Sequence, residues 1–331
     1  MPFLAGKEIT QDGLGLMRMT WHGEQTPDSI AFPVMKAALE AGVNVWNGAD
    51  FYGSPDNNSL HLVARYFAKY PEDVDKVVLC IKSGVVDMKT FKMDSSPAAV
   101  YRFVSNANQI LGGVKKIDLF GMGRQDKKTP IEDTVRALDE CVQKGLIGGI
   151  QLSEVAAKSI LRASTVAKID MVEAEISLWA TDVFENGIAE VCGELGIVMV
   201  AHTPLGAGML TGQIKSQDDI PETYLKRSFP RFRPENFQKN LDLVKELRNL
   251  ATEKGCTPAQ LALCWIKSQS RKPGYPLIVP VFGARSESRI RENATNIELT
   301  ERDLRKITEI LASFPVQGHR YPPSAAALCE Y

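Results

Sequence analysis

The segment GVNVWNGADFYG, residues 42–53, joins an expected helix to a buried strand and a polar turn. Gly42 is typical of a residue that ends a helix, and Thr26 and Pro27 are typical of the N-cap and first turn of the helix before it. The apolar run 43–46 follows at once and indicates a strand. The segment therefore predicts a helix, a strand and then a loop that carries Tyr52.

The same alternation continues along the chain on both sides of this segment. Apolar runs typical of strands occupy residues 13–17, 43–46, 76–82, 117–122, 147–153, 169–177, 197–202 and 277–283. Helical periodicity follows them, most clearly at 60–70, 96–112, 130–145, 155–166, 184–195, 236–254 and 257–269. Eight such strands favour one closed (β/α)₈ TIM barrel over an open parallel sheet. We expect a single domain over residues 1–331, with an N-terminal β-hairpin and extra helices near the C-terminus.

Composition excludes several classes of partner. The 39 basic and 40 acidic residues give a formal net charge of −1, which indicates neither a nucleic-acid surface nor an anionic membrane surface. No uncharged apolar run approaches the ~18 residues of a membrane helix, and the opening residues lack the pattern of a signal peptide. The six cysteines and four histidines show no metal-ligand spacing, so we expect free thiols and no metal site. These features predict a cytoplasmic protein, a monomer or a weak homo-oligomer, whose partner is a small molecule.

Tyr52 and Lys82 are candidate catalytic residues because of their place in the barrel. Catalytic side chains of such barrels lie at the C-terminal ends of the strands, where both residues occur. A lysine cation beside a tyrosine favours the phenolate and so makes the phenol a usable proton donor near neutral pH. In the alternative interpretation Tyr52 covers the core and Lys82 is solvated.

Several segments in chain order resemble motifs of the aldo-keto reductase superfamily. They are GVNVWNGADFYG (42–53), CIKSG (80–84), GLIGGIQLSE (145–154), EAEISLW (173–179), AHTPLGAGMLTG (201–212) and PVFGARSESRIREN (280–293). Members of that superfamily are NAD(P)H-dependent (β/α)₈ barrels that reduce aldehydes and ketones. The surface segments 14–35, 64–84 and 152–163 are most similar to its pyridoxal reductase group.

The resemblance implies that hydride passes from nicotinamide to an aldehyde carbon while Tyr52 donates the proton. Lys82 matches the lysine of the family's Asp-Tyr-Lys-His tetrad, but Asn47 stands at the aspartate position and Gly123 at the histidine position. Asn47 keeps a hydrogen-bond acceptor but removes the charge that pairs with the lysine. An unpaired Lys82 cation would favour the phenolate more strongly, whereas burial without a counter-ion would favour loss of its own proton. The sequence leaves both effects open.

The same resemblance implies NADPH/NADP⁺ as the cofactor. The residues implied to contact it are Ser153, Glu173, His202, Leu205, Gly206, Gly208, Leu210, Gly212, Gly283, Arg285, Ser286, Arg289, Glu292 and Asn293. Ser153 and Glu173 are expected at the carboxamide, and His202 as a stacking platform because no carboxylate is placed by sequence to orient it. The turn at 285–289 is expected to hold the 2′-phosphate, since cations and helix N-terminal amides favour phosphate. A solvated basic turn is the alternative.

By the family layout, Met17, Trp21, Gly123 and Arg124 border the substrate pocket, together with the tail 318–331. The favoured substrate is pyridoxal, reduced to pyridoxine. Its own phenolic hydroxyl, Arg124 or a bound water could replace the missing histidine as a hydrogen-bond donor to the carbonyl. Two alternatives are a reductase of other aldehydes or quinones, and a catalytically weak NADPH-binding regulatory protein.

Overall fold

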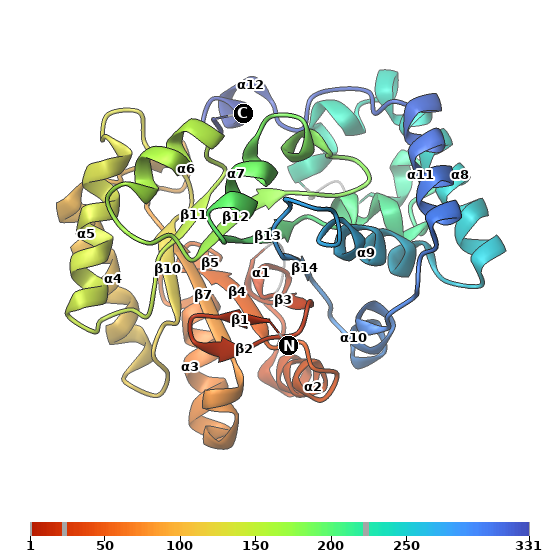
Figure 1. Ribbon diagram of the computed structural model, residues 1–331. Helices are drawn as coiled ribbons and strands as arrows, with labels where there is room; N and C mark the ends of the chain where they lie inside the picture. Colours follow the sequence, from red (N-terminus) through yellow and green to blue (C-terminus); the bar gives the residue numbers. More distant parts are fainter. Residues whose placement is uncertain (1, 22–24, 221–224, 331) are drawn as a thin grey trace.

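The computed structural model describes residues 2–21, 25–220 and 225–330, and in this part of the chain parallel strands form a closed barrel (Figure 1). The strands are β3 (Gly13–Gly15), β4 (Val45–Ala49), β7 (Val78–Ser83), β10 (Leu119–Met122), β11 (Gln151–Ser153), β12 (Met171–Glu175), β13 (Val198–His202) and β14 (Ile278–Phe282). Their order is β10-β7-β4-β3-β14-β13-β12-β11, and a parallel bridge between Phe120 and Ile150 joins the two ends. The predicted (β/α)₈ barrel is confirmed.

Helices surround the barrel, and the bounds of those from α3 to α9 follow the expected ranges closely (Figure 1). They are α1 (Met17–Thr20), α2 (Asp28–Glu40), α3 (Ser59–Lys69), α4 (Pro97–Leu111), α5 (Ile131–Gln143), α6 (Ala157–Ser164), α7 (Ile188–Glu194), α8 (Pro234–Lys254), α9 (Pro258–Gln269), α10 (Glu287–Ala294), α11 (Glu301–Ser313) and α12 (Pro323–Ala326). The start of α2 differs from the prediction, because extended Pro27 is its N-cap and the Thr26 amide bonds to the Met19 carbonyl. None of the described helices combines the length and apolar composition needed to cross a membrane.

The N-terminal hairpin, β1 (Phe3–Leu4) with β2 (Lys7–Glu8), is present as predicted. Leu4 of the hairpin and Ile9 after it are buried in one apolar cluster with the first residues of several barrel strands, among them Val45 and Val78. The hairpin therefore packs at the end of the barrel where the strands begin. The opposite end, where the strands finish, is left for polar side chains.

The C-terminal tail after α11 returns to this opposite end. Asn240 of α8 holds it there, accepting from the Gln317 amide and donating to the Gln317 carbonyl at 2.8 and 2.9 Å. Further along, the Glu330 amide donates to the Glu154 carbonyl at 3.1 Å, just beyond the end of β11. Extra helices near the C-terminus were expected, and α11 and α12 are present there. The tail that follows α11 lies at the mouth of the barrel.

The seam between β10 and β11 has no room for a side chain at Gly121 and yields a first prediction. A β-carbon at Gly121 would lie 1.9 Å from the backbone oxygen of Gln151. Gly121→Ala should therefore lower the free energy of unfolding by about 3 kcal/mol, since a backbone obstacle cannot rotate away. Urea denaturation measures the loss, with Gly15→Ala as the control because its nearest neighbour would stand 3.4 Å away. Equal stability of the two variants would contradict the tight seam.

Candidate active site

Lys82 lies at the centre of the polar end of the barrel and is only 2% exposed. Its Nζ donates to both carboxylate oxygens of Glu173, at 2.9 and 2.8 Å, and to Oδ1 of Asn47. The Asn47 amide in turn donates to Glu173 Oε2 at 2.8 Å. These side chains come from β7, β12 and β4, and β12 is not a neighbour of the other two in the sheet. The three therefore meet across the barrel interior.

The lysine and the glutamate are both charged in this arrangement. Burial alone would lower the pKa of Lys82, but the Glu173 carboxylate and, after it, Tyr52 outweigh burial and the pKa is raised. Burial would likewise raise the pKa of Glu173, yet the Lys82 cation, His202 and the hydrogen bonds from Lys82 and Asn47 lower it. The expectation that Lys82 lacks a counter-ion is therefore wrong, because Glu173 supplies the charge that Asn47 does not. The interpretation of Lys82 as a solvated residue is also wrong.

Tyr52 lies beside this ion pair, as the order of the strands predicts. The Lys82 Nζ is 5.4 Å from the centroid of the Tyr52 ring. Trp21 stacks on Tyr52 with ring centroids 5.3 Å apart, and Phe51 meets it edge-on at 5.0 Å. Phe91, from the loop between β8 (Val85–Asp87) and β9 (Lys92–Met93), stacks on Trp21 in turn. The phenol is thus half-buried, held by aromatic rings and next to a cation.

The space that a side chain at position 123 would take is already filled. A β-carbon at Gly123 would lie 3.0 Å from Cζ of Phe51. Arg124, the next residue, donates to Ser153 Oγ at 3.3 Å and to the Gly123 carbonyl. Its guanidinium is thereby placed among the strand ends. Sequence reasoning did not find Phe51 or Phe91, since a loop phenylalanine carries no signal of its own.

His202, at the end of β13, is oriented by a carboxylate that the sequence did not reveal. Its Nε2 is 2.6 Å from Glu154 Oε1, and its Nδ1 is 3.1 Å from the Thr203 hydroxyl. Glu154 is 1% exposed. Burial would raise its pKa, but the hydrogen bond and charge of His202 and the cations Arg124 and Arg320 hold the pKa well below its usual range. The expectation of a histidine without an orienting carboxylate is therefore wrong.

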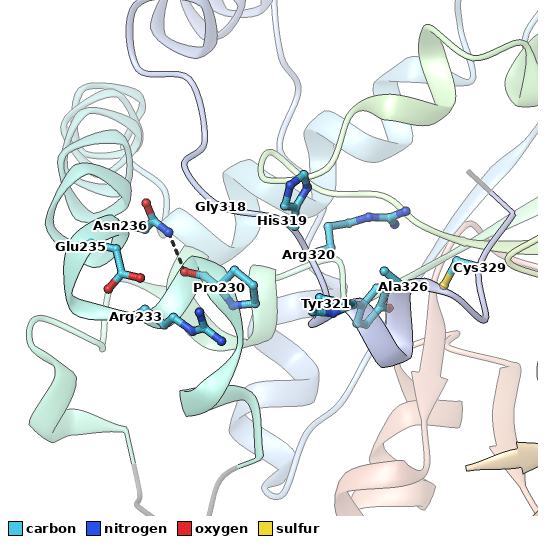
Figure 2. Close-up of a pocket in the computed structure, with 11 residues that line it drawn as sticks. Pro230, Arg233, Glu235, Asn236, Gly318, His319, Arg320, Tyr321, Ala326 and Cys329 are labelled. Atoms are coloured by element: carbon cyan, nitrogen blue, oxygen red, sulfur yellow. Dashed lines mark hydrogen bonds between the residues drawn. The ribbon is translucent and has the colours of Figure 1, made fainter. Parts of the chain in front are cut away.

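The C-terminal tail adds buried charge to the same end of the barrel. Arg320 Nη2 lies 3.9 Å from Glu154 Oε2, its Nη1 lies 3.9 Å from Glu175 Oε2, and Tyr321 donates to Glu175 at 3.2 Å. A cavity of about 580 Å³ lies between the tail and the start of α8. Figure 2 shows Pro230 and Asn236 on one side of it and Arg320 and Tyr321 on the other.

The turn between β14 and α10 carries the residues predicted to hold the 2′-phosphate. Ser286 is the N-cap of α10 and accepts from the Arg289 amide at 3.4 Å, while Arg285 and Arg289 are exposed. Arg289 also donates to Glu292 at 2.5 Å. Gly283 is exposed and Asn293 is 4% exposed. Two exposed arginines and the N-terminus of a helix thus lie together at this turn, which suits a phosphate.

The loop after β13 includes η3 (Gly206–Thr211) and makes use of its glycines. Gly206, Gly208 and Gly212 have φ values of 55°, 103° and 71°, which residues other than glycine rarely adopt. Leu205 packs partly buried against the core. Leu210 is 2% exposed, so its side chain belongs to the core, and its amide already donates to the Leu205 carbonyl at 3.2 Å.

Comparison with known proteins agrees with this fold. The model of the aldo/keto reductase family matches residues 13–312. The probable pyridoxal reductase 2 of Schizosaccharomyces pombe is 37% identical over 329 residues, which cover 97% of both chains. The putative pyridoxal reductase of Saccharomyces cerevisiae is 36% identical over 331 residues, which cover 93% of this chain and 95% of the relative. The glycerol dehydrogenase AKR11B4 of Gluconobacter oxydans has a TM-score of 0.81 at 23% identity, over 97% of both chains, and shows the shared fold. The chain belongs to the aldo-keto reductase family of oxidoreductases.

The described residues fit the nicotinamide cofactor that this family generally uses. Glu154 Oε2 is buried and has no hydrogen-bond donor within the described ranges, so it can accept from a carboxamide NH₂. Ser153 lies beside it at the end of β11, and His202 presents a ring held at both nitrogens. The exposed basic turn at 285–289 suits the far, phosphate-bearing end.

The pair of Glu154 and His202 yields a prediction about acid stability. Because the pKa of Glu154 is lower folded than its ordinary 4.5, its contribution to stability is present above that pH and is lost as the pH falls. Glu154→Gln should be about 2 kcal/mol less stable than the parent at pH 7, and the gap should narrow as the pH falls below about 4.5. Urea denaturation across this pH range measures the gap. Glu185→Gln, which removes an exposed carboxylate, is the control. If the stability difference between Glu154→Gln and the parent does not narrow at low pH, the lowered pKa of Glu154 in the folded protein is contradicted.

Proposed function

We propose that the protein reduces an aldehyde to an alcohol with NADPH, with pyridoxal, reduced to pyridoxine, as the favoured substrate. The observation that carries the proposal is a half-buried phenol, Tyr52, beside a buried and protonated lysine, Lys82. The near full-length similarity to two proteins named as pyridoxal reductases supports the substrate. We further propose that the barrel acts as one domain over residues 1–331, in the cytoplasm.

In this mechanism the side chains of the barrel move one proton and hold its donor in place. The bound nicotinamide supplies the hydride that adds to the aldehyde carbon. Tyr52 donates its phenolic proton to the carbonyl oxygen as the new C–H bond forms, and the Lys82 cation stabilises the phenolate that remains. Trp21 and Phe51 fix the plane of the Tyr52 ring. Since Tyr52 is only half-buried, it can regain its proton from solvent.

Tyr52→Phe tests the proton-donor role. The wild-type protein should oxidise NADPH when pyridoxal is added, and Tyr52→Phe should lower kcat by about 100-fold or more, as expected for loss of a general acid. A panel of other aldehydes and quinones separates pyridoxal reduction from a broader reductase. NADPH binding without turnover of any of these compounds would favour a regulatory protein, and equal kcat values in the two proteins would remove Tyr52 from the mechanism.

Arg285→Ala tests the choice of NADPH over NADH. The variant should bind NADPH about 10-fold more weakly, because it loses a charge-assisted contact to the 2′-phosphate, and should bind NADH as the parent does. Quenching of intrinsic fluorescence measures both dissociation constants. Arg291→Ala is the matched control, since Arg291 is an exposed arginine of α10 with ion pairs to Glu40 and Glu287. Equal losses for NADPH and NADH would contradict a 2′-phosphate site at this turn.

A further inference from the structure

We propose that Glu173 is the positioning residue for Lys82, and that Asn47 and Glu173 together form a single unit of one amide and one carboxylate that keeps the lysine charged and holds it beside Tyr52. This inference rests on the proposed function, because it concerns the proton donor of the same reaction. It assigns to Glu173 a role different from the cofactor contact that the sequence predicts.

The buried ammonium group of Lys82 needs compensation for its lost hydration. Lys82 is 2% exposed, and an ammonium group removed from water is stable only if an opposite charge and hydrogen bonds replace its hydration. Glu173 provides both, since each of its oxygens lies within 2.9 Å of Lys82 Nζ. Without this carboxylate, burial would favour the neutral amine, which cannot stabilise a phenolate.

The hydrogen bonds of Asn47 run in one direction, from Lys82 to Asn47 and from Asn47 to Glu173. Asn47 accepts from Lys82 through Oδ1 and donates to Glu173 through Nδ2, so both ends of its amide are used. A carboxylate at position 47 has no donor to offer Glu173 and would face it as a like charge. An amide at position 173 removes that conflict. The geometry therefore requires one carboxylate and one amide at the two positions, and either position reaches Lys82 Nζ.

Other charged and titratable groups around Lys82 do not replace Glu173. Tyr52, from the loop after β4, raises the pKa of Lys82, and Arg124, beyond β10, lowers it. Cys80 lies on the same strand, and burial raises the pKa of its thiol to a value far above neutral, so it stays uncharged. His202, from β13, acts on Glu173 and is itself paired with Glu154.

The experiment is a charge exchange between the two positions. Glu173→Gln should lower kcat with pyridoxal by about 100-fold and move the alkaline limb of the kcat–pH profile to lower pH by at least about one unit, because Lys82 then loses its proton more easily. Asn47→Asp alone should also lower kcat. The double variant Asn47→Asp/Glu173→Gln should recover kcat to within about 5-fold of the parent and return the alkaline limb, as coupled sites do.

Two controls distinguish positioning of Lys82 from other roles of Glu173. Glu175→Gln removes another buried carboxylate of β12 that contacts the tail rather than Lys82, and it should not move the alkaline limb. The dissociation constant of NADPH should change by less than about 3-fold in Glu173→Gln, because both carboxylate oxygens are already engaged within the protein. A larger change in NADPH binding with an unmoved alkaline limb would assign Glu173 to the cofactor and overturn the proposal.

Failure of the proposed function remains distinguishable from failure of this inference. If the wild-type protein reduces no aldehyde, urea denaturation still reports the charge of Lys82. The raised pKa of Lys82 stabilises the wild-type fold up to pH values near 10.5. Glu173→Gln should be less stable at neutral pH, by a gap that narrows as the pH rises, and the double variant should remove the gap. An unchanged alkaline limb in Glu173→Gln, a double variant that recovers neither kcat nor stability, or a gap that does not narrow would each overturn the proposal.

Discussion

The ion pair between Lys82 and Glu173 is the interaction on which the rest of the site depends. It joins β7 to β12 through the interior of the barrel, and Asn47 of β4 bonds to both partners. A buried pair of this kind is sensitive to the removal of either partner, because the remaining charge is left without hydration or compensation. The strands that carry these residues are therefore held relative to one another by these side-chain bonds as well as by the backbone hydrogen bonds of the sheet. The position of Tyr52 relative to a cation follows from that constraint.

The same principle explains the second buried carboxylate at the mouth. Glu154 is nearly inaccessible and bonds to His202, while Arg320 of the tail approaches its other oxygen. Glu154 and Glu173 are thus both buried carboxylates, and each has a partner of its own inside the barrel. The tail supplies part of the positive charge that compensates Glu154, through Arg320. Its return across the mouth is consequently linked to the charges of the site, and its removal would leave Glu154 with fewer compensating cations.

The sequence predicted the elements that depend on local pattern, and it failed where distant side chains meet. Buried parallel strands appear as apolar runs, so all eight were found, and strand order placed Tyr52 beside Lys82. The contact of Lys82 with Glu173 was not found, because it crosses between strands that are not neighbours and depends on side-chain reach. The resemblance also directed attention to Asn47 as a lost charge, when the charge had a different position in the barrel. Gly123 was expected to border the substrate pocket, and the contact of Phe51 with it is a packing outcome that no sequence spacing encodes.

Along β4, β7 and β12 the inward-facing side chains change from apolar to polar or charged, and this change explains why the network around Lys82 lies at one end of the barrel. In strands, side chains that point to the same side recur every second residue. On β4 this series runs from Val45 to Asn47, on β7 from Val78 through Cys80 to Lys82, and on β12 from Met171 to Glu173. The first members lie in the apolar cluster with the N-terminal hairpin, which excludes water from that end, whereas the last members form the charged network. The apolar layer beneath the ion pair keeps the local dielectric constant low, and a low dielectric constant strengthens the attraction between Lys82 and Glu173 while it makes either charge alone unfavourable. Leu4 of the hairpin and Ile9 after it belong to this apolar layer, so the hairpin covers the far end of the barrel below the ion pair.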